Sequence, residues 1–295
     1  MEPAGGVLPS DGFGGRGFHV VKLTALVCVQ NQDTQLSDCL RKLSFCDEVV
    51  VVADRCTDRS QEIARRNGCV VIDGIFPLES QRKAAGAAAC TGDWILEIEP
   101  DELVDAHLAW EIRAVLQMRP DGDHYELPID NYVGETLVRD GWAGSLSARR
   151  EVRLYKRGLK SWEARRLNAP AAVSGRSGGA LKGAVRRILG RDVGGLVERL
   201  NRLTALAAED LADRGRTPWA ISSLAAGAGV FLQGFVLRGG WREGRMGLLV
   251  ATLSATFPLL AQMRAGDVIE ARRAAVAAEA AARVSRLRDL RSGTR

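Results

Sequence analysis

Two hydrophobic patterns divide the chain near residue 192. Before that point, short continuous apolar runs alternate with stretches in which apolar residues recur at helical spacing. Buried parallel strands give continuous apolar runs, and amphipathic helices repeat every three to four residues. The first part therefore predicts alternating strands and helices. From Gly194 onward only the helical spacing remains, which predicts a C-terminal helical region.

The first part predicts a doubly wound α/β sheet. Strands are predicted over residues 20–29, 48–53, 69–72 and 94–98. The helices between them are predicted over residues 33–43, 58–67 and 78–90. Because strands that alternate with helices are joined by right-handed crossovers, this order predicts a mostly parallel sheet with helices on both faces.

Polar side chains follow the first two of these strands. Asn31 follows the first strand, while Asp54 and Asp58 follow the second. Ligands of open α/β sheets bind beyond the carboxyl ends of the strands, so these side chains are candidate ligand contacts. Asp54 is equally suited to a turn, and Asp58 to the first turn of the next helix. The turn after the first strand contains no glycine, which argues against a dinucleotide-binding dehydrogenase.

The fourth strand ends in an acidic turn. Glu99, Asp101 and Glu102 place three carboxylates within four residues. Like charges this close are unfavourable unless a positive group shares the site, and a hard divalent cation is the usual partner of carboxylate oxygens. The alternative is a solvated loop that opens the following helix. Arg82 and Lys83, near the start of a predicted helix, either face a diphosphate or form its solvent side.

Charge and composition narrow the class of partner. The 295 residues are 46% hydrophobic and carry a net charge of +5, so the chain can bury a substantial core. Residues 149–191 hold 13 Lys or Arg against 2 Asp or Glu, which predicts an anionic partner such as a phosphate-bearing substrate or a membrane surface. Nucleic acid is not expected, because no binding motif is present and aromatic content is only 5%. The six cysteines form no Cys-x-x-Cys pair and indicate a reducing, cytoplasmic setting.

The ordered set of polar motifs resembles glycosyltransferase family 2, which has the GT-A fold. The closest branch is the bacterial glucosyltransferases of lipopolysaccharide core biosynthesis. The resemblance covers residues 23–103 and continues more faintly through Gly141-Trp142 and Arg153-Leu154-Tyr155. It rests on Asn31, Asp54-x-x-Thr57-Asp58, Gln81-Arg82-Lys83, Thr91-Gly92-Asp93-Trp94-Ile95-Leu96 and Glu99-Pro100-Asp101-Glu102.

The resemblance implies an activity and a donor site. The activity is transfer of a hexose from a nucleotide-sugar donor to a lipopolysaccharide core or another envelope glycan or glycolipid, with inversion. Asp54 would contact the nucleotide base, and Cys28 and Asn31 would line the same pocket. Asp101, with Glu99, would hold Mg²⁺ or Mn²⁺ on the donor diphosphate, where the ion offsets developing negative charge. Asp58, Arg82 and Lys83 complete the implied donor site.

The chain departs from the family pattern on the acceptor side. Glu99 replaces the usual Asp of the acidic triplet. The His-Glu pair of the related branch falls near Asn168-Ala169, and neither residue can act as a base. Asp140 and Glu163 are the nearest candidate catalytic bases, and each is equally suited to a surface position. A non-catalytic, membrane-associated relative that binds a sugar nucleotide or lipid is the alternative, while a nucleotidyltransferase would need a glycine-rich basic loop after the first strand.

Two uncharged runs in the second part raise the question of a membrane. Residues 217–237 and 247–263 contain no charged residue, yet the first includes Pro218 and three glycines and the second Pro258. We expect helices that pack on the catalytic domain and dip into the cytoplasmic leaflet, which would place the protein at the inner face of the cytoplasmic membrane. Buried helices of a soluble domain and true spanning helices are the alternatives.

The expected organisation has three parts. Nothing before Phe18 forms the apolar core of a signal peptide, and residues 1–17 are predicted to be a flexible tail. Residues 18–192 form the GT-A domain, with a nucleotide-sugar half at 18–135 and an acceptor half at 136–192. Residues 193–295 form the helical region, and its stretch over 267–290 is predicted to be an exposed helix.

Overall fold

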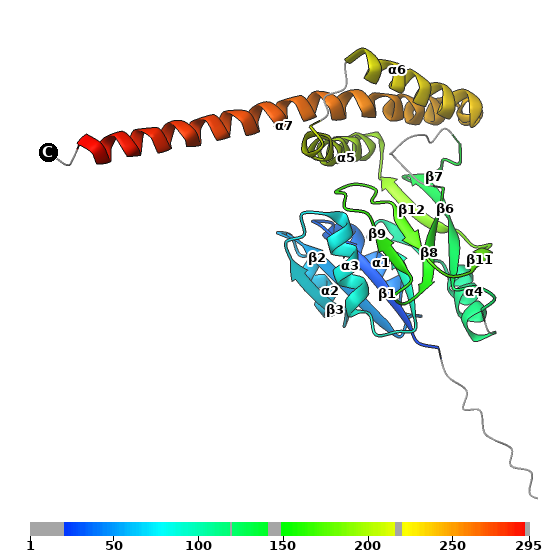
Figure 1. Cartoon of the computed structure of the whole chain (residues 1–295). Coiled ribbons are helices and arrows are strands. Elements are labelled where there is room, and N and C mark those ends of the chain that lie inside the picture. Colours follow the sequence, from blue (N-terminus) through cyan, green and yellow to red (C-terminus); the bar gives the residue numbers. More distant parts are fainter. Residues whose placement is uncertain (1–20, 119, 141–148, 216–219, 293–295) are drawn as a thin grey trace, which may run out of the picture.

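A mixed sheet, helices on both of its faces and a separate helical layer make up the protein (Figure 1). The computed structural model describes residues 21–118, 120–140, 149–215 and 220–292. The predicted tail over residues 1–17 and the Gly141-Trp142 segment of the family resemblance lie outside the described residues.

The N-terminal half of the sheet is parallel. Its order is β3-β2-β1-β4, and every neighbouring pair in it is parallel. Its strands are β1 (Leu23–Val29), β2 (Glu48–Asp54), β3 (Val70–Gly74) and β4 (Trp94–Ile98). The connecting helices are α1 (Asp33–Lys42), α2 (Ser60–Arg66) and α3 (Glu79–Ala89). The predicted α/β class with a doubly wound sheet is confirmed.

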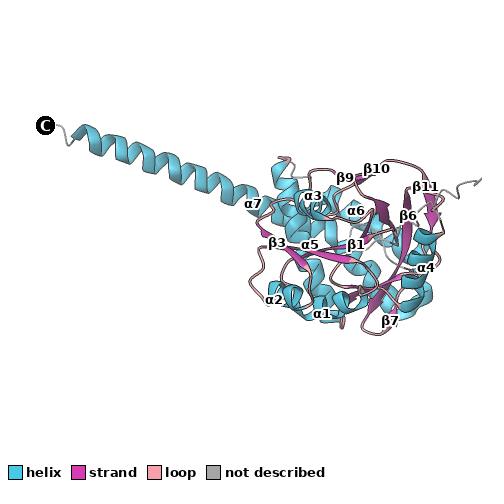
Figure 2. Ribbon diagram, turned by 90° about the horizontal axis from the view of Figure 1, so that it is seen from below, coloured by secondary structure: helices cyan, strands magenta, loops and turns pink. Residues whose placement is uncertain are grey.

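Both faces of this half are covered, which explains the continuous apolar runs. Leu23 and Val27 pack in the core that contains α1, whereas Leu26 and Val52 pack on the opposite face. Successive side chains of a strand point to opposite faces, so a strand covered on both sides needs apolar residues at every position. Figure 2 shows α1 and α2 on one side of the strands and α3 on the other. Gly86 of α3 lies directly over Leu26 and Val52, and a Cβ there would lie 2.7 Å from Val52 Cγ2.

The other half of the sheet mixes strand directions. β8 (Arg150–Lys156) lies between β4 and β6 (His124–Val133) and is antiparallel to both. β12 (Val185–Gly190) runs parallel to β6, and the edge strand β5 (Glu102–Leu103) is antiparallel to β12. This order brings β8 and β12 beside the acidic turn. The remaining elements are α4 (Ala106–Gln117), β7 (Thr136–Leu137), β11 (Ser177–Ala180) and the hairpin of β9 (Lys160–Trp162) with β10 (Ala171–Val173).

The C-terminal region is a helical layer over the sheet. Its elements are α5 (Val193–Asp213), α6 (Ala220–Phe231), the π-helix η1 (Leu232–Leu237), the 3-10 helix η2 (Gly240–Glu243) and α7 (Gly244–Ser292). α5 lies between the sheet and the pair of α6 and α7 (Figure 1). The apolar run over 247–263 and the helix predicted over 267–290 are one continuous helix with Pro258 inside it. Proline removes one helical hydrogen bond, and the packing of α7 on α5 and α6 offsets that loss.

One segment of the described residues, Gly240–Arg283, is long and apolar enough to cross a membrane by length and composition. Its most apolar window has a mean hydropathy of 1.5, and 33% of that window is buried against the rest of the protein. The core helix of a soluble protein can have the same length and composition. Residues 271–283 of α7 are exposed, and this end of the helix projects away from the other helices (Figure 1).

Candidate functional site

A cavity of about 500 Å³ opens at the carboxyl ends of β1 and β4. The end of β1, the start of α3, the acidic turn and β8 form one part of its wall, and the β9–β10 hairpin, β12 and α5 form the rest. Seven of the lining residues are Lys or Arg and five are Asp or Glu, so the lining carries a positive excess. Such a cavity favours an anionic ligand.

Five of the ten predicted site residues line this cavity. They are Cys28, Arg82, Lys83, Glu99 and Asp101. The other five do not line it. They are Asn31, Asp54, Asp58, Asp140 and Glu163.

Arginines from distant elements compensate the acidic turn. Glu102 is 1% exposed, and its Oε1 accepts hydrogen bonds from Arg153 of β8 at 3.2 Å and Arg187 of β12 at 2.9 Å. Its Oε2 accepts the backbone N–H of Glu99 at 2.7 Å. Asp101 is 4% exposed and accepts a hydrogen bond from Arg199 of α5 at 2.7 Å. The turn is therefore a buried ion-pair network, and the alternative of a solvated loop is wrong.

Two carboxylates of the turn remain available to a ligand. Asp101 Oδ1 is buried and has no hydrogen-bond partner among the described residues. Glu99 has 37% of its side chain exposed and accepts one hydrogen bond from Arg153 at 3.1 Å. Burial alone would raise the pKa of Glu99, but Arg187 and Arg153 hold it well below its usual range. Glu99 is therefore a carboxylate anion at neutral pH.

The residues present fit a divalent ion that a ligand helps to coordinate. No group of three or more His, Cys, Asp or Glu in the described parts of the chain forms a protein-only metal cage. Mg²⁺ is commonly held by one or two carboxylates together with substrate phosphates and water. Asp101 Oδ1 and the Glu99 carboxylate match that incomplete donor set.

Glu97 of β4 belongs to the same ion-pair network. It is not among the site residues that were predicted from the sequence. Its side chain is 4% exposed and lies 2.6 Å from Lys160, 2.9 Å from Lys83 and 3.6 Å from Arg153. Burial alone would raise the pKa of Glu97, but Lys160 and Lys83 lower it far below its usual range. One signal was present in the sequence, because a carboxylate interrupts the apolar run Trp94–Ile98. An unpaired carboxylate is costly in a buried strand.

Lys83 and Arg82 of α3 differ in their capacity to bind a ligand in the cavity. Lys83 is 12% exposed and is held between Glu79 at 2.8 Å and Glu97 at 2.9 Å. Arg82 lies 3.6 Å from Asp54, and its Nε is buried without a partner in the described residues. Arg82 is therefore the residue of this pair that retains hydrogen-bonding capacity toward the cavity.

The polar residues after β1 and β2 form hydrogen bonds that stabilise the loops in which they lie. Asp54 is 2% exposed and accepts hydrogen bonds from the Arg55 side chain at 2.9 Å and 3.0 Å. Asn31 Oδ1 accepts the Thr57 N–H at 2.7 Å, which ties the two loops together. Asn31 and Arg55 have φ of 52° and 49°, a left-handed conformation that few residues other than glycine adopt. Strained backbone of this kind is concentrated at ligand sites.

Asp58 joins the starts of α1 and α2. Its carboxylate accepts the backbone N–H of Asp33 at 2.9 Å and that of Ser60 at 3.0 Å. Burial acts to raise the pKa of Asp58, and the bonds from Ser60 and Asp33 lower it below its usual value. Asp58 thus lies just before α2 and binds backbone N–H groups at the starts of both helices.

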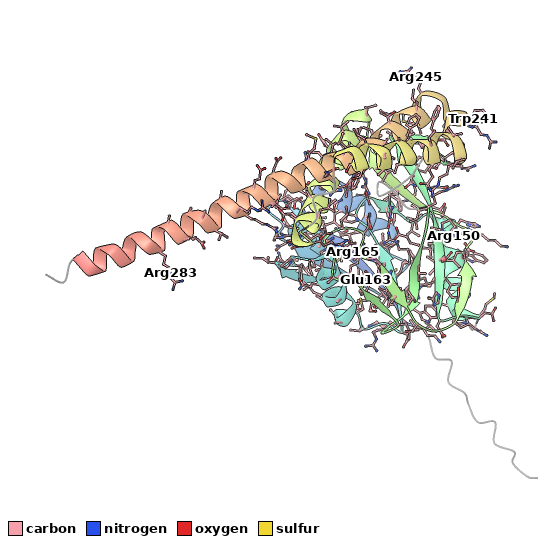
Figure 3. All side chains as sticks on the ribbon, turned by 45° about the horizontal axis from the view of Figure 1, so that its top comes forward. Arg150, Glu163, Arg165, Trp241, Arg245 and Arg283 are labelled. Carbon is pink, nitrogen blue, oxygen red and sulfur yellow. The ribbon has the colours of Figure 1, made fainter. Side chains whose placement is uncertain are left out.

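The two predicted base candidates lie outside the cavity. Asp140 has its carboxylate 3.9 Å from Arg149, and its backbone N–H donates to Glu243 at 3.0 Å. Glu163 is 63% exposed and lies 3.4 Å from Arg165; both are labelled in Figure 3. In contrast, the segment Asn168-Ala169 does line the cavity.

The cations of β8, β9, β12 and α5 were not predicted individually. The sequence predicted an anionic partner for the basic segment 149–191, and three of its cations, Lys160, Arg166 and Arg187, line the cavity. Arg199 and Arg202 line it as well, from outside that segment. Burial, followed by the neighbouring Arg199, lowers the pKa of Arg202. Arg199 and Arg202 lie in α5, whose sequence gave only an amphipathic pattern.

No protein-family model matches the chain. It is 22% identical over 249 residues to the lipopolysaccharide core biosynthesis glycosyltransferase LpsC of Rhizobium meliloti, a match that spans 81% of this chain and 89% of that protein. An uncharacterized glycosyltransferase of Rickettsia conorii is 27% identical over 95 residues, which are 32% of this chain and 34% of that protein. Over most of its length the chain is therefore similar in sequence to a glycosyltransferase.

Solved structures with a similar chain path include a mannosyltransferase bound to GDP-Man and S. aureus TarS bound to UDP. The mannosyltransferase PcManGT of Pyrobaculum calidifontis, in complex with GDP-Man and Mn²⁺, is 14% identical, with 83% of this chain and 87% of that chain covered and a TM-score of 0.49. S. aureus TarS in complex with UDP is 13% identical, with 80% and 91% covered and a TM-score of 0.44.

Replacing Glu97 by Gln is expected to destabilise the protein by about 3–5 kcal/mol, because Lys160 loses the carboxylate that neutralises it. The folded-state pKa of Glu97 is depressed, so its contribution is complete above its unfolded pKa of about 4.3 and is lost as the pH falls below that value. Urea unfolding between pH 7 and pH 3 measures both effects, and the variant should lose part of the acid dependence.

Glu62→Gln is the matched control for this measurement. Glu62 is 49% exposed and pairs with Arg66 on the surface of α2, where such a pair contributes less than about 1 kcal/mol. Equal destabilisation by the two substitutions would contradict the central place of Glu97 in the network.

Proposed function

We propose that the chain transfers a hexose from a nucleotide-sugar donor to a lipopolysaccharide core or another envelope glycan or glycolipid, with inversion at the transferred carbon and with Mg²⁺ or Mn²⁺. The observation that carries this proposal is the free Asp101 Oδ1 beside Glu99 in a cavity with a positive excess. The similarity to a lipopolysaccharide core glycosyltransferase supports the acceptor class.

The donor diphosphate would lie between the acidic turn and the cations. Asp101 and Glu99 would hold the metal ion, which supplies a Lewis acid for the departing diphosphate. Arg82 contributes further positive charge from α3. Cys28 lies at the end of β1 on the same cavity wall. Burial raises the pKa of the Cys28 thiol to about 12, so this residue contributes a neutral surface to the donor.

The loops after β1 and β2 would complete the donor site. Asp54 and Asn31 form the bonds that fix these loops, and Asp58 fixes the helices that follow them. We propose that Asp54 recognises the nucleotide base after Arg55, 43% exposed, moves away from it. Asn31 and Asp58 would then act on the donor by positioning these loops.

Asp101→Asn is expected to abolish the metal dependence of UDP binding. Wild-type protein should bind UDP at least tenfold more tightly with Mn²⁺ than without it, because the ion bridges the carboxylates and the diphosphate. Asp101→Asn should bind UDP equally with and without the ion. Isothermal titration calorimetry measures both affinities.

Asp121→Asn serves as the control, because Asp121 is exposed and lies away from the cavity. Its UDP affinities should equal those of the wild type. Failure of the wild type to bind UDP or any other nucleoside diphosphate would overturn the donor assignment.

A cavity-facing carboxylate offers a further candidate for the catalytic base. Glu151 of β8 lines the cavity, has 36% of its side chain exposed and lies 2.8 Å from Arg153. Glu97 and Glu102 are fully engaged and almost completely buried. A general base must lie within hydrogen-bond reach of the acceptor hydroxyl. Glu151 already lies in the cavity, whereas Asp140 and Glu163 would need to move to reach an acceptor there.

Glu151→Gln is expected to lower kcat by about 10²- to 10⁴-fold with little change in UDP affinity, the usual loss when a general base is removed. Asp140→Asn and Glu163→Gln provide the comparison, since one of them takes the role if Glu151 does not. Single-turnover transfer measured on all three variants decides the assignment. Donor binding with no transfer by any protein, the wild type included, would favour the non-catalytic alternative.

We further propose that the helical layer rests on the inner face of the cytoplasmic membrane. Leu237 of η1 is 81% exposed and Trp241 of η2 is 55% exposed. Arg242 lies over the Trp241 ring at 5.2 Å, and Arg245 follows at the start of α7. Figure 3 shows Trp241 and Arg245 at the same end of the helical layer. Exposed apolar side chains beside arginines suit the headgroup region of an anionic leaflet.

Trp241→Ser is expected to weaken binding to vesicles that contain phosphatidylglycerol several-fold, because it removes an apolar anchor. Trp110→Ser is the control, since Trp110 is 70% exposed but lies on α4, away from the helical layer. Vesicle flotation measures the bound fraction. Equal losses in both variants, or no vesicle binding by the wild type, would overturn the membrane assignment.

A further inference from the structure

A second pocket, of about 450 Å³, lies between α5, α6 and α7. Most of its wall is apolar, and its apolar side chains include Leu211, Val230, Phe257, Pro258 and Ala261. The proposed transfer reaction assigns nothing to this pocket. Apolar concave sites with a few polar groups are typical of small-molecule binding sites.

The pocket adjoins the cationic cavity. Leu167 and Asn168 line both spaces. α5 also forms a wall of both, with Arg202 on the cavity and Leu211 on the pocket. Nine residues of α-helix separate these two positions, which corresponds to about 13.5 Å along the axis. A ligand with an anionic head and an extended apolar chain could therefore occupy both spaces at once.

Two polar groups along this path are open to a ligand. Arg202 is exposed at the cavity wall and forms no ion pair with any carboxylate in the described part of the chain. Ser254 of α7 is 2% exposed, lines the pocket and has no hydrogen-bond partner among the described residues. A buried hydroxyl without a partner is costly, and an ester, amide or hydroxyl group of a bound molecule would satisfy it.

We propose that the pocket binds the hydrocarbon chain of a phosphate-bearing lipid acceptor while Arg202 binds its phosphate. This inference rests on the proposed function and specifies its acceptor. The chain would enter past Leu167 and Asn168, at the segment where the family pattern of the acceptor side is replaced. A free phosphorylated sugar would bind Arg202 but would leave the apolar pocket empty. An affinity that rises with alkyl-chain length therefore distinguishes a lipid phosphate from the phosphate of a free sugar.

A series of alkyl phosphates tests the proposal. Binding of inorganic phosphate and of butyl, hexyl, octyl and decyl phosphate to the full chain is measured by calorimetry below their micelle concentrations. Affinity should rise with chain length by up to about fourfold per methylene, the fold-change equivalent to about 0.8 kcal/mol. Arg202→Gln should weaken every phosphate, inorganic phosphate included, by about tenfold or more.

Ala226→Phe fills the pocket from α6, and Ala225→Phe is its matched control. Both alanines are exposed on the same helix, but only Ala226 lines the pocket. Ala226→Phe should abolish the chain-length dependence, whereas Ala225→Phe should retain it. UDP binding with Mn²⁺ by Ala226→Phe verifies that the variant is folded.

Two results would overturn the inference. Decyl phosphate that binds no more tightly than inorganic phosphate would mean that the site takes a free phosphate group. Chain-length dependence that survives Ala226→Phe would place the chain on the outer surface of the helical layer. Absence of UDP binding by the wild type would instead remove the donor assignment and leave the alkyl phosphate result intact, so the two failures are distinguishable.

Discussion

Compensation of buried carboxylates is the constraint on which the rest of the structure depends. Glu97, Asp101 and Glu102 are each less than 5% exposed and lie on or just after one strand. Buried anions are tolerated only when cations and hydrogen bonds neutralise them. Lys83 of α3 supplies one of these cations, and the others come from β8, β9, β12 and α5, which lie later in the sequence. The network therefore joins the parallel half of the sheet to the mixed half.

The same network shapes the chemistry of the cavity. Glu97 and Glu102 are occupied by ion pairs and, for Glu102, by a backbone hydrogen bond from Glu99, and Lys160 is neutralised by Glu97. What remains free is one oxygen of Asp101, the exposed part of Glu99 and the cations that exceed the carboxylates. These are the groups that a metal–diphosphate ligand requires. The ion pairs thus separate structural charges from those that can bind a ligand.

The helical layer extends the site rather than only covering it. α5 contributes Arg199 and Arg202 to the cavity, and its following turns form a wall of the apolar pocket. α6 and α7 close that pocket and carry exposed apolar residues on their outer side. A cationic cavity, an apolar pocket and an apolar outer surface therefore follow one another, which is the order of environments that a lipid-linked acceptor at a bilayer would meet.

The sequence by itself determined the parallel half of the fold, because strands buried on both faces, such as Leu23–Val29, need continuous apolar runs and the helices between them show their own period. It also located the acidic turn and the basic segment. Only the tertiary structure decided which charges meet: Arg187 and Arg199 lie 85 and 98 positions from the carboxylates that they neutralise, and no local pattern records such pairing. For the same reason the predicted bases Asp140 and Glu163 fall outside the cavity, whereas Glu151 lies within it through the antiparallel pairing of β8 with β4.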